Sequence, residues 1–455
     1  MRASVGIAIA FGIAFVFGLG TGMAWAADPV SLPPGFVQVG LSADENATAG
    51  NNATRIARDN AGHVHMVWVD SGRPGAPTGP VYRRLTVAAD GTVTFDTDPI
   101  YIADKTPGDW NAYPALAAAG DAVYLVWQGG GTARVRKVTT GPSGYSFGPA
   151  IDTGAKSEGR DVGPAIQADA SGVRVVTPAG QFAFSADGGQ TWKVDTVPLP
   201  AGQHMKTASL AADPAGGTIL AFSSVVKEVK ESAKAVGSGG YWQLRTIRRT
   251  PEGQWTDAQD VLDKFPGWAA PQGEDDSLAD WVRVGSDSAG GLHLLWHGTG
   301  ISRIYGNDQA YYAYREPKGV WHTPIPLIAQ DAARGIAFSF APSMTLDGEK
   351  IVATVFYDIY DGKRWAGFDA DLIPFLRGVA DGKPVPLTHF VRTSIDEKKP
   401  AMALSTRFPS AALAPYRADG KVWLDAVETF IPMGVPESPK LIVYHRVDAS
   451  GMLRP

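Results

Sequence analysis

Short apolar stretches alternate with polar turns along the whole chain, and one such pattern recurs seven times. Each unit opens on a small residue or a proline, continues through a short apolar stretch and a turn, and ends in an alternating strand. That strand closes on an aromatic or apolar residue, and alternation with a period of two is typical of β-strands. The units span residues 55–68, 113–127, 163–176, 208–222, 282–296, 341–356 and 408–423.

The repeat predicts an all-β fold, a single β-propeller of four-stranded antiparallel blades over residues 36–455. Propeller blades typically repeat every ~40–50 residues, and the surplus length here is expected in loops. We expect seven blades, with six as the alternative because the third unit is weak. Helix-rich folds are disfavoured, since no long stretch shows a helical period.

The two ends of the predicted domain offer a way to close the ring. Residues 36–39 precede the first unit and have the pattern of a strand, and residues 441–445 form the last strand-like segment. Pairing the two segments would remove an exposed sheet edge. We therefore expect the first strand to complete the last blade.

The N-terminus has the features of a secretory signal peptide. A basic residue at Arg2 precedes an apolar run over residues 5–19 and an Ala-x-Ala site ending at Ala26. Residues 1–26 are therefore predicted to be removed, which implies a secreted or periplasmic protein with no stable membrane span. An uncleaved anchor is the alternative. The chain has no cysteine, so neither a lipid-modified cysteine nor a disulfide is available.

Charge and motifs exclude several classes of function. The formal net charge is −5, from 41 basic and 46 acidic residues, which argues against a general nucleic-acid-binding protein. No phosphate-binding or dinucleotide-binding loop is evident, so no cofactor is expected. His63 and His65 could share one face of a strand, but no third ligand is near and no metal site is predicted. His65 and His293 each stand three residues before a Trp, which indicates packing. The oligomeric state stays open.

The segment Ser185-Ala-Asp187-Gly-Gly189-Gln-Thr-Trp192 has the most specific local pattern in the chain. Asp and Ser side chains can bond the backbone of a turn, and glycine accepts positive φ. The segment resembles the Asp-box, S-x-D-x-G-x-T-W, of the sialidase and related BNR-repeat propellers, and every position matches. In that family the Asp-box is a structural hairpin, so the resemblance concerns the fold.

Three arginines stand at the starts of units, where the innermost strands of a propeller surround the axis. Arg55 and Arg283 each precede the closing Trp of their unit by 13 residues, and Arg407 opens the seventh unit. Guanidinium groups suit carboxylates and sulfates because they offer fixed pairs of donors. The pattern predicts an anion site, and the alternative is three unrelated structural arginines.

The resemblance to sialidases implies roles for some of these residues. An arginine triad in that family holds the substrate carboxylate, which here corresponds to Arg55, Arg283 and Arg407. An Asp follows the first Arg as acid/base, and Asp70 is the candidate. The family also uses a Tyr nucleophile with a Glu, for which Tyr357 and Glu274 are candidates by region alone.

Sequence reasoning leaves three functions open. The first is a sialidase-like glycosidase or binder of an acidic glycan at the central funnel. The second is a non-catalytic propeller that binds carbohydrate or protein. The third is a uronate polysaccharide lyase with His204 and Tyr113 as base and acid, by resemblance to BNR-type propeller lyases. Asp280-Trp281 at a unit entrance suits sugar binding, since a carboxylate can bond hydroxyls beside a ring that stacks on the sugar.

Overall fold

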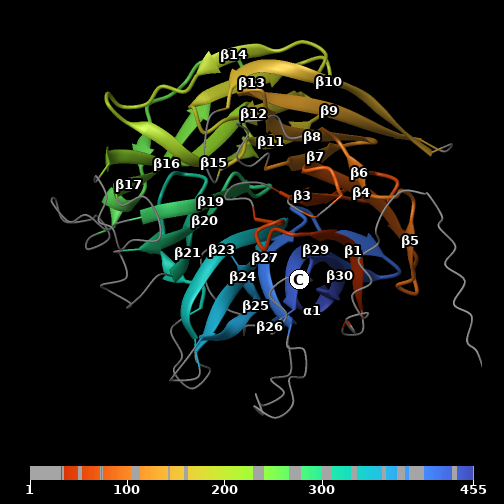
Figure 1. Cartoon of the computed structure of the whole chain (residues 1–455). Helices are drawn as coiled ribbons and strands as arrows, with labels where there is room; N and C mark the ends of the chain where they lie inside the picture. Colours follow the sequence, from red (N-terminus) through yellow and green to blue (C-terminus); the bar gives the residue numbers. More distant parts are fainter. Residues whose placement is uncertain are drawn as a thin grey trace, which may run out of the picture.

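The strands of the described residues form antiparallel sheets around a common centre (Figure 1). There are seven such sheets, each with four or five strands, and the weak third unit forms a complete four-stranded sheet. This is the all-β propeller with four-stranded antiparallel blades that the sequence predicts. The predicted signal peptide at residues 1–26 lies outside the described part of the chain. The computed structural model describes residues 32, 35–49, 54–71, 73, 75–103, 113–141, 144–157, 162–228, 240–265, 278–299, 309–328, 336–360, 365–376, 385–388, 404–432 and 438–453.

Each sheet runs outward from an innermost strand beside the axis. The innermost strands are β2 (Ile56–Arg58), β7 (Ala115–Ala119), β11 (Ala165–Asp169), β15 (His204–Ala212), β19 (Leu278–Ser286), β23 (Ile336–Asp347) and β27 (Leu404–Ala411). The second strands are β3 (Val64–Asp70), β8 (Ala122–Gly129), β12 (Gly172–Val176), β16 (Thr218–Glu228), β20 (Leu292–Thr299), β24 (Lys350–Tyr360) and β29 (Lys421–Pro432). The seven repeat units of the sequence correspond to these pairs of strands.

The outer strands complete the sheets. The third strands are β4 (Gly79–Val87), β9 (Thr132–Gly141), β13 (Gln181–Ser185), β17 (Gly240–Arg249), β21 (Gln309–Arg315), β25 (Trp365–Leu376) and β30 (Lys440–Asp448). The outermost strands are β5 (Val93–Phe95), β6 (Ile100–Tyr101), β10 (Gly144–Lys156), β14 (Lys193–Thr196), β18 (Gln259–Asp260), β22 (Ile325–Pro326), β26 (Val385–Thr388) and β1 (Phe36–Ser42). Three short elements remain: β28 (Tyr416–Ala418), a 3-10 turn at Leu262–Lys264 and α1 (Ser450–Leu453).

The last sheet joins the two ends of the described chain. Strand β1 pairs antiparallel with β30, so that Phe36 faces His445 and Ser42 faces Lys440. This confirms the closure expected from the sequence. Neighbouring innermost strands contact one another around the axis, from β2 through β7, β11, β15, β19 and β23 to β27. Strand β2 in turn contacts β29 of the last sheet.

The hydrophobic core lies between neighbouring sheets. Each large cluster of buried side chains draws on two adjacent sheets, as expected when twisted sheets pack face to face. The Trp residues that close three of the units, Trp68, Trp127 and Trp296, are almost fully buried in these clusters. The aromatic end of the repeat is therefore a packing element.

An Asp, a His and a Tyr side chain lie in the same order in two of the sheets. In the first, Asp59 Oδ2 contacts His65 Nε2 at 3.1 Å, and His65 Nδ1 contacts the Tyr82 hydroxyl at 2.8 Å. The imidazole is fully buried, and burial lowers the pKa of His65 below its usual value. This supports the packing role expected for the repeated histidines. In the second sheet, His293 Nδ1 contacts the Tyr312 hydroxyl at 2.9 Å, whereas His293 Nε2 lies 3.4 Å from Asp287 Oδ2.

The turn between β13 and β14 is a hairpin held by its own side chains. Ser185 Oγ accepts the N–H of Gly189 at 2.7 Å, and the Thr191 hydroxyl donates to Asp187 Oδ2 at 2.6 Å. These and further bonds to backbone N–H groups hold the pKa of Asp187 well below its usual range. Trp192 Nε1 donates to the carbonyl of Gly189 at 3.1 Å. The predicted structural role of this motif agrees with the geometry.

Closure of the ring requires a glycine in β1. A Cβ at Gly40 would lie 2.4 Å from Cζ2 of Trp68, because the strand crosses the indole at close range. We expect Gly40→Ala to destabilise the fold by about 1–3 kcal/mol through overpacking. Thermal unfolding of the variant checks this. Gly141→Ala, at the end of β9 with open space around it, is the matched control and should unfold close to the wild-type temperature.

Candidate functional site

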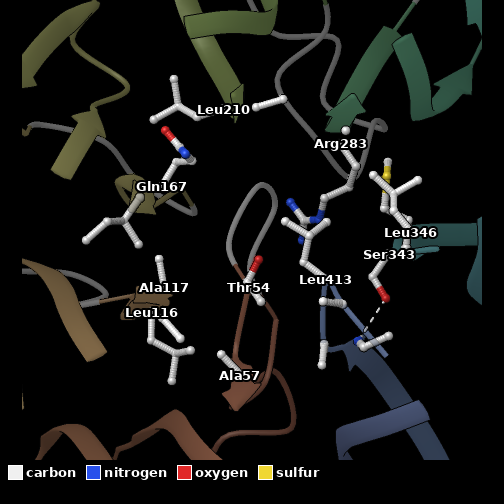
Figure 2. A pocket seen from close by; sticks show the side chains of 18 of the residues that line it. Thr54, Ala57, Leu116, Ala117, Gln167, Leu210, Arg283, Ser343, Leu346 and Leu413 are labelled. Atoms are coloured by element: carbon white, nitrogen blue, oxygen red, sulfur yellow. Dashed lines mark hydrogen bonds between the residues drawn. The ribbon is translucent and has the colours of Figure 1, made fainter. Parts of the chain in front are cut away.

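A cavity of about 450 Å³ lies on the axis of the ring. Residues from the innermost strands of all seven sheets line it, among them Ala57, Leu116, Leu210, Arg283 and Ser343 (Figure 2). The cavity extends from the level of Arg283 toward the C-terminal ends of these strands. Residues at the N-terminal starts of the same strands surround one mouth of the channel, which we call the axial mouth.

Arg55 is buried directly beside this channel. Its side chain has no exposed surface, and Nη2 donates to the carbonyl of Ala49. Its Nε and Nη1 groups have no hydrogen-bond partner among the described residues. The backbone N–H of Arg55 donates to Ser410 Oγ at 3.1 Å, which joins the first innermost strand to the last. A buried guanidinium whose N–H groups lack protein partners can donate hydrogen bonds to an anion.

Arg283 lies close enough to Arg55 for their charges to interact. Arg283 is partly exposed to the cavity, and burial lowers the pKa of each guanidinium to about 9. The charge of Arg283 lowers the pKa of Arg55 further, whereas Tyr113 opposes this. The structure therefore brings together two of the three arginines that the sequence singled out, and the pair concentrates positive charge near the axis.

Tyr113 completes this group from the neighbouring sheet. Cζ of Arg55 lies 5.9 Å from the centre of the Tyr113 ring, and Tyr113 is 8% exposed. Gly163 packs against it so closely that a Cβ there would lie 2.5 Å from Cβ of Tyr113. The absence of a side chain at Gly163 thus allows the tyrosine to sit between two innermost strands.

Four innermost strands carry a β-bulge near the axial mouth. In each, two residues of the innermost strand face one residue of its partner, which bends the strand and redirects side chains. Bulges of this kind often lie next to binding sites. The bulges fall between Met205 and Ala208, Asp280 and Arg283, Phe340 and Ser343, and Arg407 and Ser410.

Two of these bulges place aromatic rings against each other. Trp281 and Phe408 have φ angles of 55° and 51°, which bulky residues rarely adopt. Their rings stack with centres 4.9 Å apart and planes 15° from parallel, although the sheet that begins with β23 lies between their two sheets in the ring. Strained backbone of this sort clusters at binding sites. The sequence pattern pointed to Trp281 but not to Phe408, because no local pattern predicts a positive φ at a non-glycine residue.

A charged cluster lies beside Trp281. Lys206 Nζ contacts Asp280 Oδ2 at 3.1 Å, and Asp280 Oδ1 accepts the N–H of Trp281 at 2.8 Å. His297 pairs with Asp280 across the two strands, and burial lowers the pKa of His297 to about 4. The imidazole is therefore neutral near pH 7. Sequence analysis did not single out His297, whose position became meaningful only through strand register.

Arg407 does not occupy the same level as Arg283. It faces Thr429, before the bulge, whereas Arg283 follows its bulge, so the register matches Arg407 to Asp280. The sequence pattern placed Arg407 at the start of a unit that closes on Trp423, as Arg283 stands in a unit that closes on Trp296. The level expected for Arg407 was wrong, because Trp423 lies near the start of β29. Arg407 Nη1 contacts Glu45 Oε1 at 2.6 Å and Asn46 Oδ1 at 3.3 Å.

Asp70 lies in a different pocket. It ends β3, is 1% exposed, and lines a pocket of about 230 Å³ against β1 together with Arg73 and Tyr101. Arg73 Nε donates to both Asp70 oxygens at 2.9 and 2.8 Å, and the Tyr101 hydroxyl also contacts Asp70. Burial and this carboxylate raise the pKa of Tyr101 to about 12. Asp70 does not line the axial cavity.

The other candidates are placed as follows. His204 starts β15 on the same side as the axial mouth and is exposed. Tyr357 lies in β24, and Glu274 falls outside the described residues. Within the described ranges, no group of three His, Cys, Asp or Glu side chains is placed to hold a metal ion. No helix in the described part of the chain has the length and apolar character needed to cross a membrane.

The buried charge of Arg55 leads to a stability prediction. We expect Arg55→Met to unfold at or above the wild-type temperature near pH 7, because an isolated buried cation is costly. The folded-state pKa of about 9 lies below the ordinary value of 12.5, so the unfolded chain holds the proton longer and wild-type stability rises as pH passes 9. The advantage of the variant should therefore shrink between about pH 7 and about pH 10 in thermal unfolding. A variant that is destabilised equally at both pH values would contradict this.

Comparison with known proteins finds likeness in fold. No protein-family model matches the chain, and no curated protein is similar to it. An ulvan lyase, from a new family of polysaccharide lyase named PL25, is 10% identical with a TM-score of 0.55 over 89% of this chain and 94% of that chain. Such a lyase bound to -[GlcA(1-4)Rha3S]- is 11% identical with a TM-score of 0.54, over 89% and 95%. An α-L-arabinanase of Penicillium chrysogenum complexed with arabinobiose is 12% identical with a TM-score of 0.42, over 93% and 100%. At such low identities, the likeness to the two lyase structures shows a shared fold and no more.

Proposed function

We propose that this protein binds an acidic glycan at the axial mouth, with Arg55 and Arg283 holding a carboxylate or sulfate. The observation that carries the proposal is the state of Arg55, a fully buried cation whose Nε and Nη1 lack a partner among the described residues. Its cost to folding is expected to be offset when an anion binds. Arg283 adds a second positive charge close by.

A sugar ligand is supported by the side chains around this anion site. The stacked rings of Trp281 and Phe408 offer an apolar face, and Asp280 and Lys206 offer hydrogen bonds to hydroxyl groups. The lyase with a similar fold was solved with an oligosaccharide that contains a uronate and a sulfated sugar. A carbohydrate that carries negative charge would suit both the two arginines and the aromatic and polar side chains of the axial mouth.

A uronate lyase is the second candidate, because Tyr113 lies beside Arg55. In β-elimination a base takes the C5 proton, the electron pair forms the C4=C5 double bond, and the C4–O bond breaks. The leaving oxygen then takes a proton from an acid. Arginines would stabilise the charge that develops on the carboxylate, with Tyr113 as acid and His204 as base.

A sialidase-type hydrolase has less support from the geometry. That reaction needs an acid near the arginines, whereas Asp70 contacts Arg73 in a separate pocket and Arg407 contacts Glu45. Secretion into the periplasm or the medium stays part of the proposal and depends on the signal-like residues 1–26.

Binding to an acidic oligosaccharide tests the proposal. We expect a tetrasaccharide that alternates glucuronate with a neutral sugar to bind the mature chain, as measured by titration calorimetry. Arg55→Met and Arg283→Met should each weaken binding roughly tenfold to hundredfold, since a charged hydrogen bond is lost. Arg248→Met is the matched control. Arg248 lies in β17, the third strand of its sheet, and forms an ion pair with Asp213. Equal affinity in all three variants would refute the anion site.

Enzyme activity is a separate measurement on the same oligosaccharide. A lyase produces an unsaturated sugar whose C4=C5 double bond absorbs ultraviolet light, and Tyr113→Phe should abolish this signal while binding persists. A fluorogenic sialoside serves as the comparison substrate. Binding without either product would identify a non-catalytic carbohydrate-binding propeller.

A further inference from the structure

A pocket of about 580 Å³ lies between two neighbouring sheets, those that contain β17 and β21 (Figure 1). It is lined by the turn after β15, the C-terminal ends of β17 and β21, and the turn before β20. The axial mouth is formed by the N-terminal starts of the innermost strands, so this pocket opens on the opposite face of the ring. Its volume falls in the range of pockets that hold small organic molecules.

The two sheet faces that enclose this pocket each end in an arginine. On β21, Tyr311 and Ala313 lie in the core between the sheets, and Arg315 follows two residues later on the same face. On β17, Leu244 lies in the same core, and Arg248 follows four residues later on its face. Two guanidinium groups from facing sheets therefore line the pocket where the apolar core ends.

The two arginines differ in their bonding. Arg248 Nε donates to Asp213 Oδ2, and Arg248 Nη2 donates to the carbonyl of Gly216 at 3.4 Å. Arg315 is partly buried, its Nε has no hydrogen-bond partner among the described residues, and its Cζ lies 5.9 Å from the centre of the Trp321 ring. Burial lowers the pKa of Arg315, the charge of Asp213 opposes this, and the charge of Arg248 adds to it. Since Asp213 bonds Arg248, the guanidinium of Arg315 has no bonded carboxylate in the described part of the chain.

We infer that this pocket binds a small aliphatic acid whose carboxylate contacts Arg315. A planar guanidinium offers paired N–H donors that match one carboxylate, and a single positive charge suits a monoanion better than a dianion. The methylene groups of the ligand would contact the apolar part of the lining, which consists of Pro214, Ala215, Ala289 and Pro317. This site goes beyond the proposed glycan function and does not depend on it, because none of its lining residues belongs to the axial mouth.

Calorimetric titration with pentanoate, and with pentanamide as the uncharged analogue, tests the inference. We expect the mature chain to bind pentanoate roughly tenfold more tightly than pentanamide, and Arg315→Met should remove this difference. Arg136→Met is the matched control. Arg136 also has an Nε without a partner among the described residues, but it lies in β9 and does not line this pocket. Equal affinity of the wild type for the two ligands, or an unchanged pentanoate affinity in Arg315→Met, would overturn the inference.

A pocket-filling variant keeps the test independent of Arg315. Ala289 is exposed in the turn before β20 and lines the pocket, so Ala289→Phe should occupy the space without disturbing the core. We expect pentanoate binding to fall roughly tenfold in this variant, with thermal unfolding close to that of the wild type. The acidic tetrasaccharide should bind Arg315→Met as it binds the wild type, since the pocket and the axial mouth lie on opposite faces. Unchanged pentanoate affinity in Ala289→Phe would place the ligand elsewhere, and loss of tetrasaccharide binding in Arg315→Met would assign the pocket to the glycan. Either result would overturn the inference.

Discussion

The pairing of β1 with β30 is the constraint on which the rest of the structure depends. It joins the N-terminal and C-terminal strands of the described chain in one sheet, and strand β29 of that sheet contacts β2 of the first sheet. The bond from the Arg55 backbone to Ser410 then links the first innermost strand to the last. With the ring closed in this way, side chains from distant parts of the sequence meet at the axis. Gly40 makes the closure compact, since it lets β1 lie against Trp68.

Closure also explains how a costly charge is maintained. Arg55 and Arg283 come from different sheets, and packing of those sheets holds them near each other although both are cations with lowered pKa values. The large core between the sheets supplies the stability that this arrangement requires. The positive φ angles of Trp281 and Phe408 add backbone strain, and so a further cost in folding free energy, at the axial mouth. Buried charge and strained backbone each cost folding free energy, and their occurrence together at one place is typical of a binding site.

The axis offers two kinds of surface to ligands. The axial mouth has aromatic rings, an Asp–Lys pair and a neutral imidazole, whereas the cavity has aliphatic walls. Arg283 lies at the boundary between them, because it follows the bulge in β19 and lines the cavity.

The sequence by itself determined the features that depend on local spacing. Alternating strands, turn glycines and buried Trp residues recur with the repeat, and the Ser185–Trp192 hairpin bonds within itself, so pattern alone located the sheets, their closing strand and this turn. Only the tertiary structure decided which chemistry-bearing side chains meet. A β-bulge adds a residue to one strand without changing the hydrophobic pattern of the sequence. Counting residues to an aromatic therefore put Arg407 at the level of Arg283, whereas the strand register puts Arg407 at the level of Asp280. Asp70 likewise follows Arg55 in the chain, as the acid/base of the sialidase resemblance would. Its contacts with Arg73 and Tyr101 depend on how the strands pack against one another.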